Sequence, residues 1–144
     1  GTMTMADEQL VTRMHFGFDE KRLLLRFDTV GPARTRLSDV ELLRIVMVQP
    51  AGFELLVSRP GDARPTVQLF HNDVPVSSPG GEAASDVILE LGVGWRNLVQ
   101  RAESPLHFYA ELIVKGQSVE RIPHEGAIET FVPSADYELM MWQA

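Results

Sequence analysis

Histidines are the residues best suited to metal binding and to proton transfer near neutral pH, and the chain contains four. Zinc sites usually show two ligands separated by about three to five residues. No two of the histidines are spaced in this way, since they are His15, His71, His107 and His124. We therefore expect them at the surface or at strand ends, with no metal site.

Paired carboxylates are a second kind of candidate, because two of them can act as general acid and base. The pairs here are Asp19 with Glu20 and Asp39 with Glu41. Carboxylates in such positions, at the ends of predicted strands, are usually solvated turn residues. The sequence also lacks cysteine and shows no nucleophile-elbow, phosphate-cradling or calcium-loop motif. We expect no catalytic residue and no cofactor.

Aromatic rings are a third kind of candidate, because sugar-binding modules stack pyranose rings on exposed Trp and Tyr faces. Trp95, Tyr109 and Trp142 are our candidate carbohydrate-binding residues, and Tyr137 is a further possible platform. The large apolar area of such rings is more often buried than exposed. For each ring we therefore favour packing in the core or between domains over ligand stacking.

The composition predicts a globular domain and argues against several partners. The 144 residues are 44% hydrophobic and 23% charged, with a formal net charge of −7 and only two lysines. Nucleic-acid surfaces need clustered basic residues, so nucleic acid is not expected as a partner. No apolar run approaches the ~20 residues that span a bilayer, so no membrane is expected either.

The domain organisation predicted is a single module. Residues 1–9 resemble a tag remnant and flexible N-terminus, and they lack the basic and apolar regions of a signal peptide. Residues 10–144 then form one domain, excised from a larger chain. The lack of cysteine is typical of a reducing compartment, so we expect a cytoplasmic protein.

The clearest predicted element is a hairpin between Leu10–Phe18 and Leu23–Asp28, joined by a polar turn. Both segments alternate with the period of a half-buried strand. Gly17 in the first segment is expected to form a bulge or to permit a close approach of another backbone. In the first segment, the residues expected to share the more apolar face of the strand are Leu10, Thr12, Met14, Phe16 and Phe18.

The apolar run Val40–Val48 fits a helix face as well as a strand. Its β-branched residues, and Pro50 and Gly52 directly after it, favour a strand paired with Phe53–Ser58. The other segments expected to be strands are 66–71, 87–91, 108–114, 119–122 and 127–132.

Three further segments are expected to connect these strands. Thr29–Asp39 and Val74–Ser85 have the composition of connections, and Gly94–Arg101 is the only short helix candidate. The result is about nine strands with little helix. This pattern predicts an all-β protein, an antiparallel β-sandwich of the immunoglobulin-like or jelly-roll-like kind.

Part of the chain resembles a known family. The hairpin His15–Asp28 is similar to the opening "Phe-Gly-Phe-Asp … Leu-x-Leu-Arg-hydrophobic-Asp" of the C-terminal β-sandwich domains attached to glycoside hydrolase family fifty-seven enzymes. Thr29–Ser85 departs from the family pattern. The remaining matches are Ile88–Leu91, Arg121–Gly126, Phe131–Pro133 and Asp136–Trp142.

The resemblance implies a sandwich similar to family-nine carbohydrate-binding modules and to the glucodextranase C-terminal region. It also implies an accessory, noncatalytic role beside a glycosidase, whose catalytic carboxylates belong to a separate (β/α) barrel. Within the resemblance, Asp19 closes the first hairpin by hydrogen bonding to the backbone. Gly126 supplies a positive φ before the last strand.

Three functions are compatible with these observations. The first is an accessory domain that packs on the catalytic domain of the same parent chain, a glycoside hydrolase, and stabilises it; this hypothesis predicts an exposed apolar patch near Leu139–Trp142. The second is a carbohydrate-binding module for an α-glucan or related polysaccharide. The third, an independent small enzyme, would need histidines and carboxylates to converge in a cleft.

Overall fold

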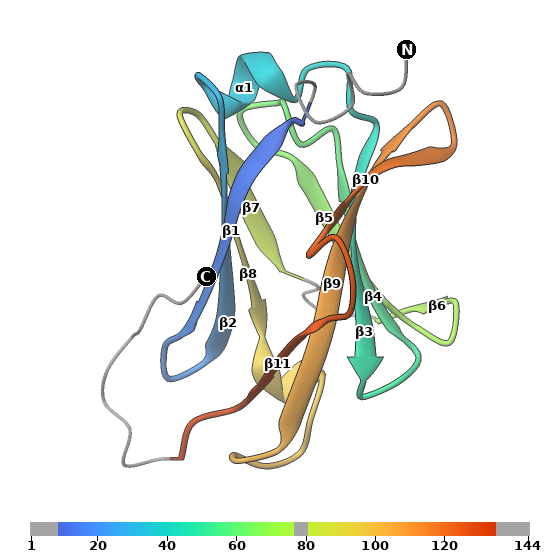
Figure 1. Ribbon diagram of the computed structural model, residues 1–144. Coiled ribbons are helices and arrows are strands. Elements are labelled where there is room, and N and C mark those ends of the chain that lie inside the picture. The colour runs from blue at the N-terminus through green and yellow to red at the C-terminus, as the bar shows by residue number, and fades with distance from the viewer. Residues whose placement is uncertain (1–8, 77–80, 135–144) are drawn as a thin grey trace.

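The computed structural model describes residues 9–76 and 81–134, and they form two antiparallel sheets packed face to face (Figure 1). The expected all-β sandwich is therefore confirmed. The described residues contain eleven strands instead of about nine. The additional two are short strands inside Val74–Ser85, which we had expected to be a connection.

The smaller sheet has four strands. The strand β2 is one of its two central strands because it pairs with both β1 and β8, and the buried side chains of Leu23, Leu25 and Phe27 face the core as expected. The order of the strands is β1 (Val11–Phe18), β2 (Arg22–Thr29), β8 (Leu89–Gly94) and β7 (Glu82–Ser85).

The larger sheet has seven strands. Val40–Val48 contains a strand as expected, because β3 forms a hairpin with β4, and β3 also pairs with β9. The order is β10 (Gln117–Ile122), β9 (Pro105–Val114), β3 (Leu42–Gln49), β4 (Phe53–Ser58), β5 (Thr66–His71) and β6 (Val74–Pro75), while β11 (Ile128–Phe131) also pairs with β9.

The strand β6 is compatible with a proline because it has only two residues and ends its sheet. Proline lacks the N–H that a central strand needs, but an edge strand tolerates it. Composition alone therefore predicted a loop at Val74 and Pro75, although these two residues pair with β5.

The core lies between the two sheets and joins them through aromatic and aliphatic side chains. Phe16 from the four-stranded sheet meets Phe108 from the seven-stranded sheet edge to face, with ring centroids 6.1 Å apart. Leu43, Leu69 and Leu112 are fully buried in the same core. Burying each such side chain stabilises the fold by about 1.5–3 kcal/mol relative to leaving it exposed.

The prediction for the start of β1 was wrong in two respects. The bulge lies between Val11 and Arg13, whereas Gly17 pairs in regular register with Leu24. Because the bulge adds a residue, it reverses the alternation: Val11 is buried and Thr12 is exposed. The bulge therefore turns the Val11 side chain toward the core, the same side to which the buried side chains of the rest of β1 point.

One end of the sandwich is closed by a short helix that the sequence did not predict. The helix α1 (Ala33–Arg36) lies at the top of Figure 1, inside the expected connection Thr29–Asp39. The backbone N–H groups of Ala33 and Arg34 donate to the carbonyls of Val87 and Asp86. Ala33 and Leu37 are fully buried, so this helix covers the core between the two sheets.

The second helical segment lies within the range that the sequence predicts. Within Gly94–Arg101 the chain forms a 3₁₀ turn, η2 (Trp95–Asn97). Gly126, expected to adopt a positive φ before the last strand, has a φ of 71°.

Glu120 links the edges of the two sheets. Its carboxylate accepts hydrogen bonds from the backbone N–H groups of Leu10 (2.7 Å) and Val11 (2.9 Å), although it belongs to β10. A register shift in β10 lies between Ser118 and Glu120. Irregularities of this kind commonly redirect a side chain. The carboxylate thus satisfies two backbone donors at the beginning of β1.

Candidate functional site

Trp95, the first candidate sugar platform, packs into the fold. Its side chain is largely buried, and its indole N–H donates to the backbone carbonyl of Glu20 at 3.2 Å. The guanidinium of Arg96 lies 4.8 Å from the centre of the ring. This ring therefore anchors η2 to the turn between β1 and β2, and it does not present an open face to solvent.

Tyr109, the second candidate, lies on β9 with its side chain directed away from the core. It is half-buried, and its neighbours in sequence, Phe108 and Ala110, are fully buried on the opposite side. The guanidinium of Arg121 covers the ring at 3.9 Å from its centroid and also donates to the Pro123 carbonyl at 3.1 Å. The face of the ring that a sugar could use is thus shared with a cation.

The third candidate, Trp142, lies outside the described residues, as does Tyr137. The expected apolar patch near Leu139–Trp142 lies outside them as well.

Tyr109 belongs to a larger surface, the outward side of β9, β3, β4 and β5, which we call the outer face of the seven-stranded sheet. Its centre is an ion-pair network: Arg44 contacts Glu54 at 3.0 Å and Glu111 at 3.6 Å. The three residues come from three adjacent strands. The single cation is thereby held by two anions on a half-buried surface.

Apolar side chains surround this network. Outward positions of an antiparallel sheet that face water are usually polar, but here many are apolar and half-buried. Strand register places Val46 opposite Tyr109 and Leu42 opposite Ile113. At the end of the same face, Val48 is 50% exposed and Phe131 is 60% exposed. The apolar residues of the outer face are Leu42, Val46, Val48, Leu56, Phe70, Tyr109 and Ile113.

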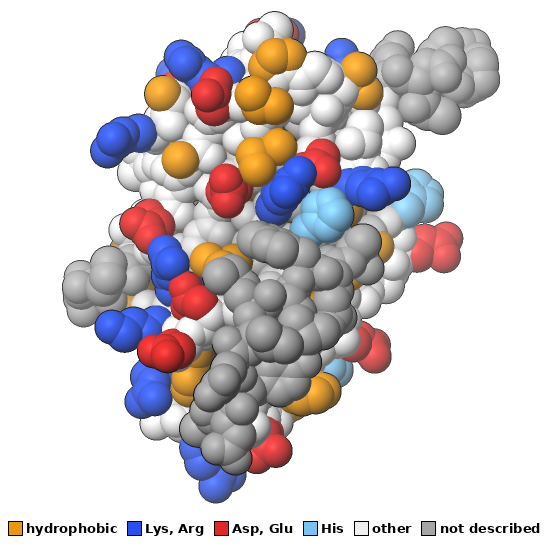
Figure 2. Space-filling view, turned by 90° about the vertical axis from the view of Figure 1, so that its left-hand side faces the viewer, with side chains coloured by type: hydrophobic (Ala, Val, Ile, Leu, Met, Phe, Trp, Pro, Cys, Tyr) orange, Lys and Arg blue, Asp and Glu red, His pale blue; other side chains and the backbone are white. Residues whose placement is uncertain are grey.

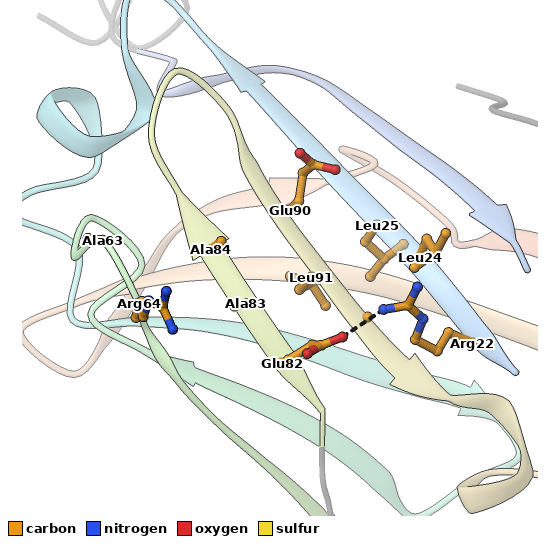
Figure 3. Close-up of a pocket in the computed structure, with 11 residues that line it drawn as sticks. Arg22, Leu24, Leu25, Ala63, Arg64, Glu82, Ala83, Ala84, Glu90 and Leu91 are labelled. Carbon is orange, nitrogen blue, oxygen red and sulfur yellow. Dashed lines mark hydrogen bonds and ion pairs between the residues drawn. The ribbon is translucent and has the colours of Figure 1, made fainter.

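A groove lies on the outward side of the opposite, four-stranded sheet, over β2, β8 and β7 (Figure 3). Its floor includes Gly92 and its wall includes Leu24, which face each other across the register of β2 and β8. The loop between β4 and β5 contributes Ala63 and Arg64. The charged residues that line the groove are Arg22, Arg64, Glu82 and Glu90.

Two of these charged residues hold each other in place. Arg22 contacts Glu82 at 2.6 Å, drawn as a dashed line in Figure 3, and Asp19 at 2.8 Å. By contrast, the side chains of Arg64 and Glu90 have no ion-pair or hydrogen-bond partner among the described residues. Sequence reasoning missed all four groove residues, because β7 was expected to be loop and its pairing with β8 could not be inferred.

Asp19 closes the β1–β2 hairpin as the resemblance implied. Its carboxylate accepts hydrogen bonds from the backbone N–H groups of Lys21 (2.9 Å) and Arg22 (2.6 Å). Burial raises the pKa of Asp19, but these bonds and the Arg22 guanidinium outweigh it, so the pKa lies below its ordinary value. The same ion pair raises the pKa of Arg22.

A second charged cluster joins His15, Arg26 and Asp28 on the outward side of β1 and β2. Asp28 contacts Arg26 at 2.8 Å and His15 at 3.3 Å. Burial raises the pKa of Asp28, yet the hydrogen bond and charge of Arg26, together with His15, lower it overall. These groups form an ordinary cross-strand ion-pair cluster.

Of the other histidines, His71 makes an aromatic contact. His71 stacks on Phe53, with ring centroids 4.0 Å apart and an angle of 6° between the planes. Among residues 9–76 and 81–134, no three His, Asp or Glu side chains gather in a group that could hold a metal ion.

Acidic and basic side chains are interspersed over the described part of the surface on the four-stranded-sheet side (Figure 2). No helix in the described part of the chain is long and apolar enough to cross a membrane. Comparisons with protein-family models, curated proteins and solved structures give no significant match to this chain.

Proposed function

We propose that this chain is a noncatalytic accessory domain that docks against another protein domain and stabilises it. The observation that carries the proposal is the outer face of the seven-stranded sheet. Half-buried apolar side chains surround Arg44, which forms ion pairs with both Glu54 and Glu111. Covering the apolar side chains favours docking, and the cost of removing the charged groups from water is partly offset because Arg44 stays paired with both carboxylates.

The residue types of this face are those of protein interfaces. Aromatic residues and arginine are enriched at the centre of interfaces, and lysine is depleted. Here Tyr109 and Phe70 lie on strands of one sheet and Arg44 lies on a strand between them. The exposed side chains of Val48 and Phe131 extend the apolar surface to one end of the sheet.

The partner that we propose is the catalytic domain of a glycoside hydrolase in the same parent chain. The support for this part is the resemblance of His15–Asp28, and of the segments around Arg121–Gly126 and Phe131–Pro133, to the accessory domains of family fifty-seven enzymes. The parent would act in carbohydrate metabolism, and this domain would contribute stability without catalytic groups.

Site-specific photo-crosslinking tests the docking surface. A photoreactive amino acid is placed at Leu56 in the full product of the gene, in the cells that make it, and the crosslinked peptides are identified by mass spectrometry. Arg101, whose exposed side chain lies outside this face, is the matched control position. We expect crosslinks from Leu56 to one domain with glycosidase activity; equal, scattered crosslinks from both positions would refute the proposal.

A further inference from the structure

The charges at the centre of the outer face indicate what a docked partner has to supply. Two carboxylates share Arg44: its Nη2 atom lies 3.0 Å from Glu54 Oε2, and its Nη1 atom lies 3.6 Å from Glu111 Oε1. The first distance is that of a hydrogen bond, whereas the second is longer than one. Glu111 is therefore the more weakly paired of the two carboxylates.

A second cation, Arg121, lies near Glu111 but is engaged elsewhere. Strand register places Arg121 on β10 opposite Glu111 on β9. Its guanidinium nevertheless lies over the ring of Tyr109, 3.9 Å from the centroid, and donates to the Pro123 carbonyl at 3.1 Å. These two contacts commit the charge of Arg121 to the neighbouring ring and to the backbone.

The surroundings of Glu111 make a weakly paired charge unfavourable once a partner covers it. Tyr109 and Ile113 lie on the same outward side of β9, two residues before and two residues after Glu111. The Glu111 side chain is only 18% exposed, so water already reaches it poorly. Removing the remaining water is costly unless a positive charge replaces it. Docking is therefore favoured by a partner that brings a cation to Glu111.

The charge of the whole chain favours the same kind of partner. Its formal net charge is −7, which attracts a positively charged surface during the encounter and repels a negative one. The side chains around the network are apolar, and they gain most from contact with other apolar groups. The complement of this face is thus a basic side chain surrounded by apolar ones.

We infer that the partner docks with an arginine or lysine that reaches Glu111, set among apolar side chains that cover Tyr109 and Ile113. In the complex Arg44 pairs chiefly with Glu54 and the cation of the partner pairs with Glu111, so that two positive charges balance two carboxylates. This inference rests on the proposed function and specifies the chemistry of the surface that the outer face recognises.

The sign of the effect of Glu111→Gln tests the inference. The variant is made in the full product of the gene with the photoreactive amino acid at Leu56, which lies opposite Arg44 in register, and the yield of the crosslink to the partner domain is measured. We expect the yield to fall several-fold, because the cation of the partner loses its carboxylate and faces Arg44 instead. A yield that stays the same or rises would overturn the inference, since it would mean that docking only has one carboxylate fewer to desolvate.

Two further variants control for charge and for folding. Glu90→Gln removes the same charge from an exposed glutamate on the opposite sheet and should leave the yield unchanged; an equal fall would show that only net charge matters, against the inference. Circular dichroism of the purified product establishes that the variants are folded. If Glu111→Gln does not fold, Glu54→Gln gives the same readout, because Arg44 then turns to Glu111 and competes with the cation of the partner. An unchanged yield in that variant contradicts the inference as well.

A double-mutant cycle then identifies the cation. Each Arg and Lys in the crosslinked segment of the partner domain is replaced by Gln, with and without Glu111→Gln. We expect one replacement to lower the yield in the wild type and to cause no further loss beside Glu111→Gln. If only Arg121→Gln behaves in this way, the chain supplies the cation itself and the inference fails while docking stands. Scattered crosslinks from Leu56 in the wild type would refute the proposed function and this inference together.

Discussion

At the scale of single residues, Trp95 and Asp19 both bond to backbone groups of the turn between β1 and β2. Trp95 was a candidate sugar platform, but the residue is only 7% exposed and its indole N–H donates to the Glu20 carbonyl. Asp19 belongs to a carboxylate pair in the sequence, and it binds backbone N–H groups of its own turn. Substitution of either residue is therefore expected to change the free energy of unfolding.

Trp95→Ala should lower the free energy of unfolding by about 3–5 kcal/mol, because it removes a large buried ring and leaves a cavity. Urea denaturation measures the loss. Arg96→Ala is the matched control: it removes only the exposed cation over the ring and should cost much less. A loss below that of the control would show that the ring does not pack in the core.

Asp19 should make the fold sensitive to acid. Its pKa is lower in the folded chain than its ordinary value of 3.8, so its stabilising effect is complete above that value and is lost as the pH falls through the folded pKa. The unfolding free energies of the wild type and of Asp19→Asn should therefore differ at pH 7 and converge under acid. A constant difference across this range would contradict the assignment.

At the scale of elements, alternation predicted most strands but not their irregularities. The hairpin of β1 and β2 and the strand nature of β3 followed from apolar periodicity and the turn residues between them. The bulge after Val11 did not, because a bulge is stabilised by a partner strand and by Glu120, which is far away in sequence. The local composition of a segment does not reveal which distant segment it pairs with.

The helix α1 and the strands β6 and β7 escaped prediction for the same reason. Four residues, Ala33–Arg36, are too few for a helical period, and the first donors of the helix bond to Val87 and Asp86 across the fold. The groove was missed along with β7, since it forms only where β7 lies beside β8. Tyr109 was identified from its residue type, but Arg121 above it was not.

Glu120→Ala should loosen the junction of the two sheet edges, because the backbone N–H groups of Leu10 and Val11 lose their acceptor. We expect a loss of about 1–3 kcal/mol in unfolding free energy and faster hydrogen exchange at these two amides. Glu129→Ala, an exposed carboxylate on β11, is the control and should change neither. Unchanged exchange at Val11 would contradict the proposed link between the edges.

Gly61→Ala tests how closely the turn after β4 approaches the end of α1. A Cβ atom at this position would lie 2.8 Å from the carbonyl oxygen of Leu37 and 2.9 Å from Cα of Ser38. Since backbone atoms must move to admit it, the substitution should cost about 1–3 kcal/mol, measured by thermal or urea unfolding. A variant as stable as the wild type would show that this end of the sandwich is loosely packed.

At the scale of the whole molecule, the two outward sheet surfaces differ in chemistry. The outer face of the seven-stranded sheet is apolar with paired charges around Arg44. The four-stranded sheet carries a groove whose charged lining residues are Arg22, Arg64, Glu82 and Glu90. A sandwich leaves two outward faces available for binding, and the apolar one is the face that we propose for docking.

Hydroxyl-radical footprinting tests the central claim most directly. It compares the chain alone with the chain bound to the domain identified by crosslinking, and it reads the reactivity of Leu56 and Tyr109 against Leu24, a half-buried leucine on the opposite sheet. Docking through the seven-stranded sheet predicts that Leu56 and Tyr109 become several-fold less reactive while Leu24 does not change. Unaltered reactivity at Leu56 and Tyr109, or protection of Leu24 instead, would contradict it.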